Sequence, residues 1–335
     1  MRAIVFTQPG DSAVLSLVDR DLPEPGPGEV RVRLLRAGVN PTDWKRRQNP
    51  QEFDEVTPGQ DGAGVVDAVG AGVEGLAVGD RVWLLLAQRE KAYGTAAEYT
   101  VQVAAHVVPL PDGASYDLGA SLGVPAITAH RALTSAEFGP SRLGPGTMDG
   151  FTVLVAGGAG AVGNAAIQLA RWAGATVITT VSSDEKAALA TAAGAQHTIN
   201  YRDGDTARRI LAIAPDGVDI AVEVAPAQNI HIDLEVVRVH GLVSIYANNG
   251  GDAMTMPLRA AFGKNLRFQF LILYTLDEHL LQAAVEDVNA AVAVGALRVG
   301  EDAGIALHHF ALEETAAAQD AVEGGAVGKV LIDVG

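Results

Sequence analysis

One stretch near the middle of the chain restricts the fold more than any other. It reads FTVLVAGGAGAVGNAAIQLARWAGATVITTV and covers residues 151–181. An apolar run, a glycine-rich turn, a helical repeat and a second apolar run follow one another, which predicts a strand–helix–strand unit of a parallel sheet. Apolar residues recur at helical spacing and predict one helix face that packs on this sheet: Val162, Ala166, Leu169, Ala170 and Ala173.

The glycines of this turn have the spacing of a dinucleotide-binding loop. Gly158, Gly160 and Gly163 follow the predicted strand and open the predicted helix, a context that makes the pattern specific. The first would permit the sharp turn, the second would let the main chain approach a pyrophosphate, and the third would allow close helix packing. Phosphates would then lie against the free amides of the first helical turn, at Ala161 and Val162. A turn that serves packing alone is the alternative.

The rest of the chain predicts a second kind of domain. Up to about residue 122, short β-rich segments broken by glycine and proline predict a partly open barrel or a sandwich: RAIVF, EVRVRLL, GAGVVDAVG, DRVWLLL and AEYTVQV. GVDIAVEV and GLVSIYA predict further strands of the parallel sheet. After Leu273, two helical runs precede a last strand, KVLIDV, and we expect this tail to return to the first domain.

Bulk composition excludes several classes of function. The 335 residues suffice for two domains, and the absence of Cys excludes disulfides, thiolate zinc sites and cysteine nucleophiles. The formal net charge of −16 disfavours nucleic acid as a partner, because such binding depends on Lys and Arg. No apolar run approaches the ~20 residues of a membrane span and no signal peptide is recognisable, so we expect a cytoplasmic protein.

Segments from most of the chain point to one family. They are AGVNPTDW near position 40, PGQDGAGVVDAVGAGVEGLAVGDRV from Pro58, GTAAEYTV from Gly94, GVPAITAHRAL from Gly123, the glycine-rich turn, and AGAQHTINYRDGD from Ala193. Together they resemble the zinc-independent quinone oxidoreductases, the zeta-crystallin-like branch of the medium-chain dehydrogenase and reductase superfamily.

This resemblance implies a fold and an assembly. It implies a GroES-like catalytic domain of residues 1–125 and 274–335, and a Rossmann domain, a doubly wound parallel sheet, of residues 126–273. The active site would lie in the cleft between the two domains. The resemblance also implies a homodimer joined by Rossmann edge strands, for which KNLRFQFLIL from Lys264 is the candidate segment. The same apolar strand could equally be an interior one.

Zinc-dependent relatives differ from this chain at the ligand positions. They carry Gly-His-Glu where this chain has Gly59, Gln60 and Asp61, and an amide does not replace an imidazole as a zinc ligand. None of the eight His residues shows metal-ligand spacing, and the adjacent His308 and His309 would diverge on a strand. We therefore expect no catalytic zinc.

The resemblance also implies the site residues. Asn40 and Asp43 match catalytic positions, although NPTD is a good turn sequence in its own right. Lys45 stands where relatives usually carry Tyr, and it maps to the substrate side as a third catalytic residue. Further residues match positions near the cofactor: Asp61, Thr128, Asn248 and Lys329.

The substrate pocket departs from the family at a second position. Ala96 stands where an aromatic residue is often found before Ala-Glu-Tyr, so the pocket would be wider than usual. Three aromatic side chains could offer flat surfaces to a planar substrate, and each could equally be core packing: Trp44, Tyr246 and Tyr274.

The end of the second Rossmann strand predicts NADPH as the cofactor. No carboxylate follows Val181, where NAD enzymes commonly bind the ribose, and Asp184 and Glu185 fall in the first turn of the next helix. Side chains suited to a 2′-phosphate are Ser182, Ser183, Lys186, Tyr201 and Arg202, the last two matching NADPH-using relatives. Ser182 could instead form a capping box with Glu185, and Lys186 could be a solvated surface residue.

These residues favour reduction of a conjugated acceptor. Without zinc, hydrogen-bond donors must stabilise the negative charge that forms on oxygen as hydride arrives, and Asn40 and Lys45 can donate. A quinone or an enone spreads that charge, whereas a simple alcohol does not. The alternatives are a reductase of enoyl thioesters and a non-catalytic, crystallin-like NADPH-binding protein.

Overall fold

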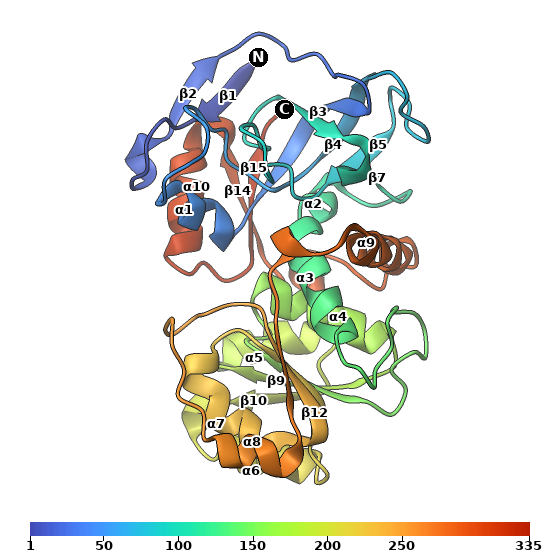
Figure 1. Cartoon of the computed structure of the whole chain (residues 1–335), viewed down its shortest axis with the longest axis vertical. Coiled ribbons are helices and arrows are strands. Elements are labelled where there is room, and N and C mark those ends of the chain that lie inside the picture. The colour runs from blue at the N-terminus through green and yellow to red at the C-terminus, as the bar shows by residue number, and fades with distance from the viewer. The chain divides into compact units, whose positions relative to one another are not determined.

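The computed structural model describes all 335 residues, which form two compact units. Unit 1 comprises Met1–Val124 with Ala306–Gly335, and unit 2 comprises Pro125–Ile305. The tail returns to the first unit, as the sequence predicts (Figure 1). It does so at Ala306 and not at residue 274, because helix α9 (Glu278–Ala293) packs against α4 (Ala161–Trp172) within unit 2.

Unit 1 is built on a seven-stranded sheet. Its strand order is β14-β15-β3-β4-β5-β7, and β6 pairs with β3. The strands are β3 (Glu29–Val39), β4 (Asp61–Val69), β5 (Arg81–Leu84), β6 (Tyr99–Val103), β7 (Val107–Pro109), β14 (Leu307–Ala311) and β15 (Lys329–Asp333). A separate two-stranded sheet contains β1 (Arg2–Val5) and β2 (Ser16–Asp19). The helices of this unit are α1 (Pro41–Arg47), α2 (Tyr116–Gly119) and α10 (Thr315–Glu323).

The core of unit 1 joins segments from both ends of the sequence. Val30, Val32 and Leu34 alternate along β3 and are buried with Val330 and Ile332 of β15. This alternation is expected for a strand that buries one face. Because β15 pairs antiparallel with β3, the last strand of the chain lies directly beside the segment that leads into α1.

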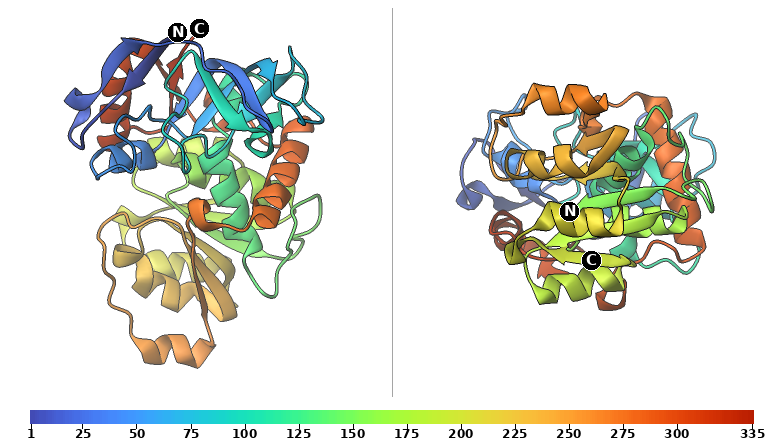
Figure 2. Two further views of the ribbon diagram at one scale, coloured as in Figure 1. Left: turned by 45° about the horizontal axis from the view of Figure 1, so that its top comes forward. Right: turned by 90° about the horizontal axis from the view of Figure 1, so that it is seen from below.

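Unit 2 is a doubly wound parallel sheet. Its strand order is β10-β9-β8-β11-β12-β13, and every neighbouring pair is parallel. The strands are β8 (Thr152–Ala156), β9 (Thr176–Val181), β10 (His197–Asn200), β11 (Val218–Glu223), β12 (Val237–Ile245) and β13 (Arg267–Phe270). The remaining helices are α3 (Gly123–Thr134), which begins at the end of unit 1, α5 (Asp184–Ala192), α6 (Thr206–Ile213), α7 (Pro226–Val236) and α8 (Leu258–Lys264). Helices α4–α8 pack against this sheet (Figure 2).

Short 3₁₀ turns complete the chain. They are η1 (Ser12–Val14), η2 (Ala104–His106), η3 (Tyr201–Asp203), η4 (Leu273–Thr275), η5 (Glu301–Ala303) and η6 (Leu312–Glu314). None of the helices combines the length and apolarity that a bilayer crossing requires.

Strand β13 lies at the edge of the sheet in unit 2 and pairs only with β12. The candidate segment from Lys264 is therefore an edge strand and not an interior one. Large apolar side chains in and beside it are exposed: Phe270 by 63% and Ile272 by 57%, and on helix α8 Leu258 by 56% and Phe262 by 68%.

Candidate functional site

The glycine-rich turn connects β8 to α4, and its glycines are needed for different reasons. Gly157 has φ = +71°, so the left-handed residue of the turn is Gly157, directly before the motif's first glycine. A Cβ at Gly158 would lie 2.2 Å from Thr179 Oγ1, and a Cβ at Gly163 would lie 2.5 Å from the Gly157 carbonyl oxygen. At Gly160 the nearest atom would be 3.5 Å away, so this glycine leaves open space beside the main chain.

This turn fits a dinucleotide phosphate. Gly160 is the N-cap of α4, and the amides that follow it, at Ala161 and Val162, belong to the first turn, which has no intrahelical acceptors. The first turn carries no acidic side chain that would repel an anion. Free amides, the positive end of the helix dipole and the open space at Gly160 together suit a pyrophosphate.

Ser182, Ser183 and Lys186 lie together directly after β9. Ser183 is the N-cap of α5, and its hydroxyl accepts from the Lys186 amide at 3.3 Å. The capping-box interpretation of Ser182 with Glu185 is therefore wrong, because the neighbouring serine caps the helix. Lys186 Nζ donates to Ser182 Oγ at 3.0 Å, so its ammonium is held over the end of the strand.

The other predicted cofactor residues of unit 2 lie on separate elements. Thr128 is buried in α3. Tyr201 is half-exposed in η3, directly after β10, and the Arg202 amide beside it donates to Asn200 Oδ1 at 3.1 Å. Asn248 follows β12, and its amide nitrogen donates to Asp252. Because β10 and β12 are parallel to β8, Tyr201 and Asn248 lie at the carboxyl edge of the sheet, as Gly158 and Ser182 do.

A cavity of about 380 Å³ lies at this same edge. It is lined by residues after β12 and β13 and by the first residues of α7, among them Tyr246, Asn248 and Ile272. Of the three aromatic side chains predicted to face a substrate, Tyr246 lines this cavity. Tyr274 belongs to η4, and Trp44 to α1 of the other unit.

Asn40, Asp61 and Lys329 form a buried cluster in unit 1. Asn40 Nδ2 donates to Asp61 Oδ2 at 2.7 Å, and Lys329 Nζ donates to Asn40 Oδ1 at 2.8 Å. Lys329 Nζ also lies 3.5 Å from Asp61 Oδ2. Each of the three side chains is at most 3% exposed. Three elements supply them: the end of β3, the start of β4 and the start of β15.

The Asp61 carboxylate is fully engaged. Its Oδ1 accepts from the Val124 amide at 2.8 Å, and its main-chain oxygen accepts from Thr95 Oγ1 at 2.8 Å. Burial raises the pKa of Asp61 and lowers the pKa of Lys329, and the attraction between the two charges opposes both shifts. Removing one partner of such a pair costs about 3–5 kcal/mol, because the other charge stays buried without compensation.

Two glycines make room for this cluster. A Cβ at Gly38 would lie 3.0 Å from Lys329 Nζ and 2.0 Å from the Ala120 carbonyl oxygen. A Cβ at Gly123 would lie 2.2 Å from Asp61 Oδ1. Neither glycine was identified from the sequence as part of the site. The signal that could have identified Gly38 is its place in the sequence, directly before Val39 and Asn40.

Asp43 is buried next to the cluster and has a structural contact of its own. Its Oδ2 accepts from the Asn40 amide at 2.7 Å, and its buried Oδ1 has no partner. Desolvation raises the pKa of Asp43 to about 7. The turn interpretation therefore holds for Asp43, which anchors the start of α1, whereas the Asn40 side chain reaches Asp61 instead.

Lys45, the third predicted catalytic residue, lies two residues after Asp43 on α1 and is partly exposed. Its Nζ is 5.6 Å from the centroid of the Trp44 ring. The structure thus brings Asn40, Asp43, Asp61 and Lys329 together.

The metal-ligand position of zinc-dependent relatives holds Gln60, which is buried. Its Oε1 accepts from the Gln88 amide at 3.3 Å. No three His, Asp or Glu side chains are arranged to hold a metal ion. His308 and His309 bond separate partners, the Val327 carbonyl and the Asp333 carboxylate, each at 2.8 Å.

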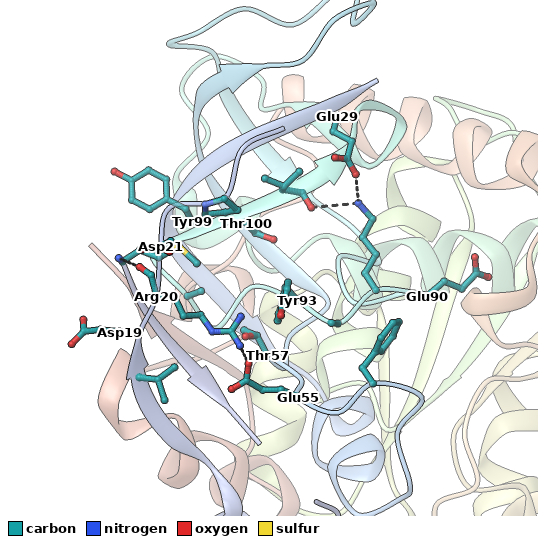
Figure 3. Close-up of a pocket in the computed structure, with 18 residues that line it drawn as sticks. Asp19, Arg20, Asp21, Glu29, Glu55, Thr57, Glu90, Tyr93, Tyr99 and Thr100 are labelled. Atoms are coloured by element: carbon teal, nitrogen blue, oxygen red, sulfur yellow. Dashed lines mark hydrogen bonds and ion pairs between the residues drawn. The ribbon is translucent and has the colours of Figure 1, made fainter. Parts of the chain in front are cut away.

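A second cavity, about 760 Å³, lies elsewhere in unit 1 and is lined by none of the predicted site residues. Its two side-chain cations each pair with a carboxylate of the lining: Lys91 Nζ lies 2.9 Å from Glu29, and Arg20 pairs with Glu55 (Figure 3). The Arg20 guanidinium also covers the Tyr93 ring, 4.3 Å from its centroid. We do not assign the substrate to this cavity, because these cations are already neutralised and no cluster residue reaches it.

Known proteins share this architecture over the whole chain. Residues 26–112 match the family described as alcohol dehydrogenase GroES-like domain, and residues 161–290 match the family described as zinc-binding dehydrogenase. Rat quinone oxidoreductase is 32% identical over 255 residues, which cover 75% of this chain and 74% of the rat protein.

Two solved structures extend the comparison. Quinone oxidoreductase from Pseudomonas syringae superposes with a TM-score of 0.84 at 29% identity and covers 99% of both chains. The structure of Escherichia coli quinone oxidoreductase in complex with NADPH gives a TM-score of 0.83 at 25% identity and covers 100% of both chains.

Proposed function

The chain belongs to the zeta-crystallin-like quinone oxidoreductases of the medium-chain dehydrogenase and reductase superfamily, and from this premise we propose that it reduces a quinone or an enone with NADPH and without a metal. One observation carries the proposal: a buried, mutually hydrogen-bonded cluster of Asn40, Asp61 and Lys329 stands beside the position where zinc-dependent relatives bind their metal. This cluster holds a hydrogen-bond donor rigidly, as a metal-free reduction requires.

Different residues would bind the pyrophosphate and the 2′-phosphate of the cofactor. Gly160 with the amides of Ala161 and Val162 would hold the pyrophosphate, while Ser182 and Lys186 would face the 2′-phosphate. The relative from Escherichia coli that was solved with NADPH supports this assignment. When bound, the reduced nicotinamide supplies a hydride.

The chain's own residues would stabilise the charge on the acceptor oxygen and supply a proton. The free N–H of Asn40 donates to the acceptor oxygen as that oxygen gains negative charge, and Lys45 is a second donor. One hydride and one proton convert a quinone to a hydroquinone, or an enone to a ketone. The proton comes from Lys45 or from water.

The test is NADPH consumption with a panel of quinones, enones and enoyl thioesters. We expect turnover with quinones or enones and little with simple ketones, because only conjugated acceptors spread the developing charge. Tight NADPH binding without turnover of any acceptor would overturn the proposal in favour of a non-catalytic role, and turnover of enoyl thioesters alone would favour the acyl reductase.

We also propose that two copies pair through β13, because its edge is unpaired and Phe262, Phe270 and Ile272 are exposed around it. Exposed apolar patches beside an open sheet edge are favourable sites for self-association.

A further inference from the structure

The Lys329 ammonium has an acceptor within unit 1 for each of its three N–H donors. Its Nζ has acceptors at Asn40 Oδ1 (2.8 Å), the Val39 carbonyl oxygen (3.3 Å) and Asp61 Oδ2 (3.5 Å). An ammonium carries three N–H donors, and three acceptors surround this one. The side chain is 2% exposed. Lys329 therefore has no donor left for a cofactor, the role that the family resemblance implied for it.

The neighbours of Asn40 allow only one orientation of its amide. The oxygen must face Lys329, because an ammonium only donates, and the nitrogen must face the Asp61 carboxylate, because an ionised carboxylate only accepts. A half-turn of the amide would bring two donors together and two acceptors together. One N–H of Nδ2 bonds Asp61, and its second N–H has a fixed direction.

Without Lys329 this orientation would depend on Asp61 alone. Asp61 alone fixes the nitrogen only as long as Asp61 is ionised, and burial already raises its pKa. A protonated Asp61 can donate to the amide oxygen, so the amide would then turn over and present its carbonyl.

We propose that Lys329 is a positioning residue for the reduction: its ammonium fixes the Asn40 amide so that the second N–H, and not the carbonyl oxygen, meets the substrate oxygen. This inference rests on the proposed function, in which Asn40 is the donor. Lys329 acts through Asn40 and does not touch the substrate. Gly38 contributes by leaving the space that the Lys329 ammonium occupies.

The first experiment compares Lys329→Met with the double variant Lys329→Met/Asp61→Asn. The single change leaves a buried carboxyl without its cation, so it lowers both stability and kcat. The double change removes the charge pair together and should recover stability. The new amide side chain at position 61 would then accept from the Val124 amide and donate to Asn40 Oδ1, which holds the Asn40 amide in the turned orientation.

The expected result is a double variant that is folded, binds NADPH as tightly as the wild type and has a kcat lowered by about 10²-fold or more, the scale of one lost oxyanion donor. Lys91→Met is the matched control, because Lys91 also bonds a carboxylate and a main-chain carbonyl in unit 1, and it should keep the wild-type kcat (Figure 3). A double variant with wild-type kcat would overturn the inference and reduce Lys329 to a counter-ion of Asp61.

A second measurement does not depend on turnover. In ¹⁵N spectra of the side-chain amides, the two Asn40 protons should be widely separated in the wild type, because one bonds a carboxylate, and should converge and shift in Lys329→Met. Unchanged Asn40 resonances would contradict the positioning role. If the resonances shift as expected but no wild-type acceptor is reduced, the proposed function fails while the structural role of Lys329 stands.

Discussion

We expect cofactor choice to depend on Lys186. It lies in the first turn of α5, where a cation opposes the helix dipole, yet its Nζ is held on Ser182 at the end of β9. The two acidic residues of that turn, Asp184 and Glu185, face the dipole favourably instead. A cation kept at an unfavourable helix end suggests an anion as its partner.

Replacing Lys186 with Ala should lower kcat/KM for NADPH by tenfold to several hundredfold and change NADH use little. The reason is the loss of one charge pair with the 2′-phosphate, worth about 1 kcal/mol in water and about 4 kcal/mol at an intermediate dielectric. Steady-state kinetics with both cofactors measure the effect, with Lys264→Ala as a control from the same unit. A wild type that uses both cofactors equally would show that the phosphate pocket is misassigned.

Asp43 should make the stability of the protein depend on pH. Its pKa is 3.8 in the unfolded reference and about 7 in the folded chain, so folding favours the protonated form. This contribution is complete below about pH 4 and is lost as the pH rises toward 7. At about 1.4 kcal/mol per unit of pKa, the loss is on the order of 4 kcal/mol.

The variant Asp43→Asn removes this titration. The unfolding free energy of the wild type should therefore fall relative to that of the variant as the pH rises from 4 to 7, and the difference should stay constant above that range. Urea unfolding at several pH values measures it. A difference that does not change with pH would mean that Asp43 ionises normally in the folded chain.

At the scale of the elements, the side chain of Asp287 on α9 connects this helix to two other segments of unit 2. Its Oδ2 lies 2.8 Å from His130 Nε2 of α3 and 2.7 Å from the Leu143 amide, and its Oδ1 accepts from Arg142. One carboxylate thus holds two helices and the loop before β8. These contacts outweigh burial and lower the pKa of Asp287 to about 2.

The substitution Asp287→Asn should destabilise the protein by about 3–5 kcal/mol, the cost of breaking a buried charged contact. Glu286→Gln is the control: Glu286 shares Arg142 but its side chain is 52% exposed, so its loss should cost less than about 1 kcal/mol. Because its folded pKa is depressed, the contribution of Asp287 is complete above about pH 4 and is lost as the pH falls toward 2. Equal effects of both substitutions on thermal unfolding would contradict this account.

On the scale of the whole molecule, the exposed apolar edge around β13 bears on assembly. The double variant Phe270→Glu/Ile272→Glu places two charges on that edge, and we expect it to shift the protein from dimer to monomer in light scattering. Val294→Glu, also at an exposed apolar position of unit 2 but in the loop after α9, should leave the dimer intact. A wild type that is monomeric at every concentration would refute self-association through this edge.

Much of the secondary structure can be predicted from the sequence, because local patterns of apolar residues and glycines are enough to identify it. Continuously apolar strands such as β8 and the helix repeat of α4 are recognisable alone, whereas β2, β7 and β14 have neither a continuous apolar run nor a clear alternation. The motif identifies the glycine turn, but it does not show that Gly157, the residue before its first glycine, has the left-handed backbone. The partners of Lys329 could not be predicted, because 268 residues separate it from Asp61.

That separation has a consequence for synthesis. The ribosome makes Asn40 and Asp61 early, then all of unit 2, and only afterwards β15 with Lys329. Until that strand emerges, β3 can pair with β4 and β6 but not with β15, and Asp61 lacks its cation. Unit 1 therefore cannot complete its core, whereas unit 2 already can. The nascent chain can therefore complete unit 2 first and unit 1 last, and a chain released before residue 329 would carry a folded Rossmann unit attached to an unfinished unit 1.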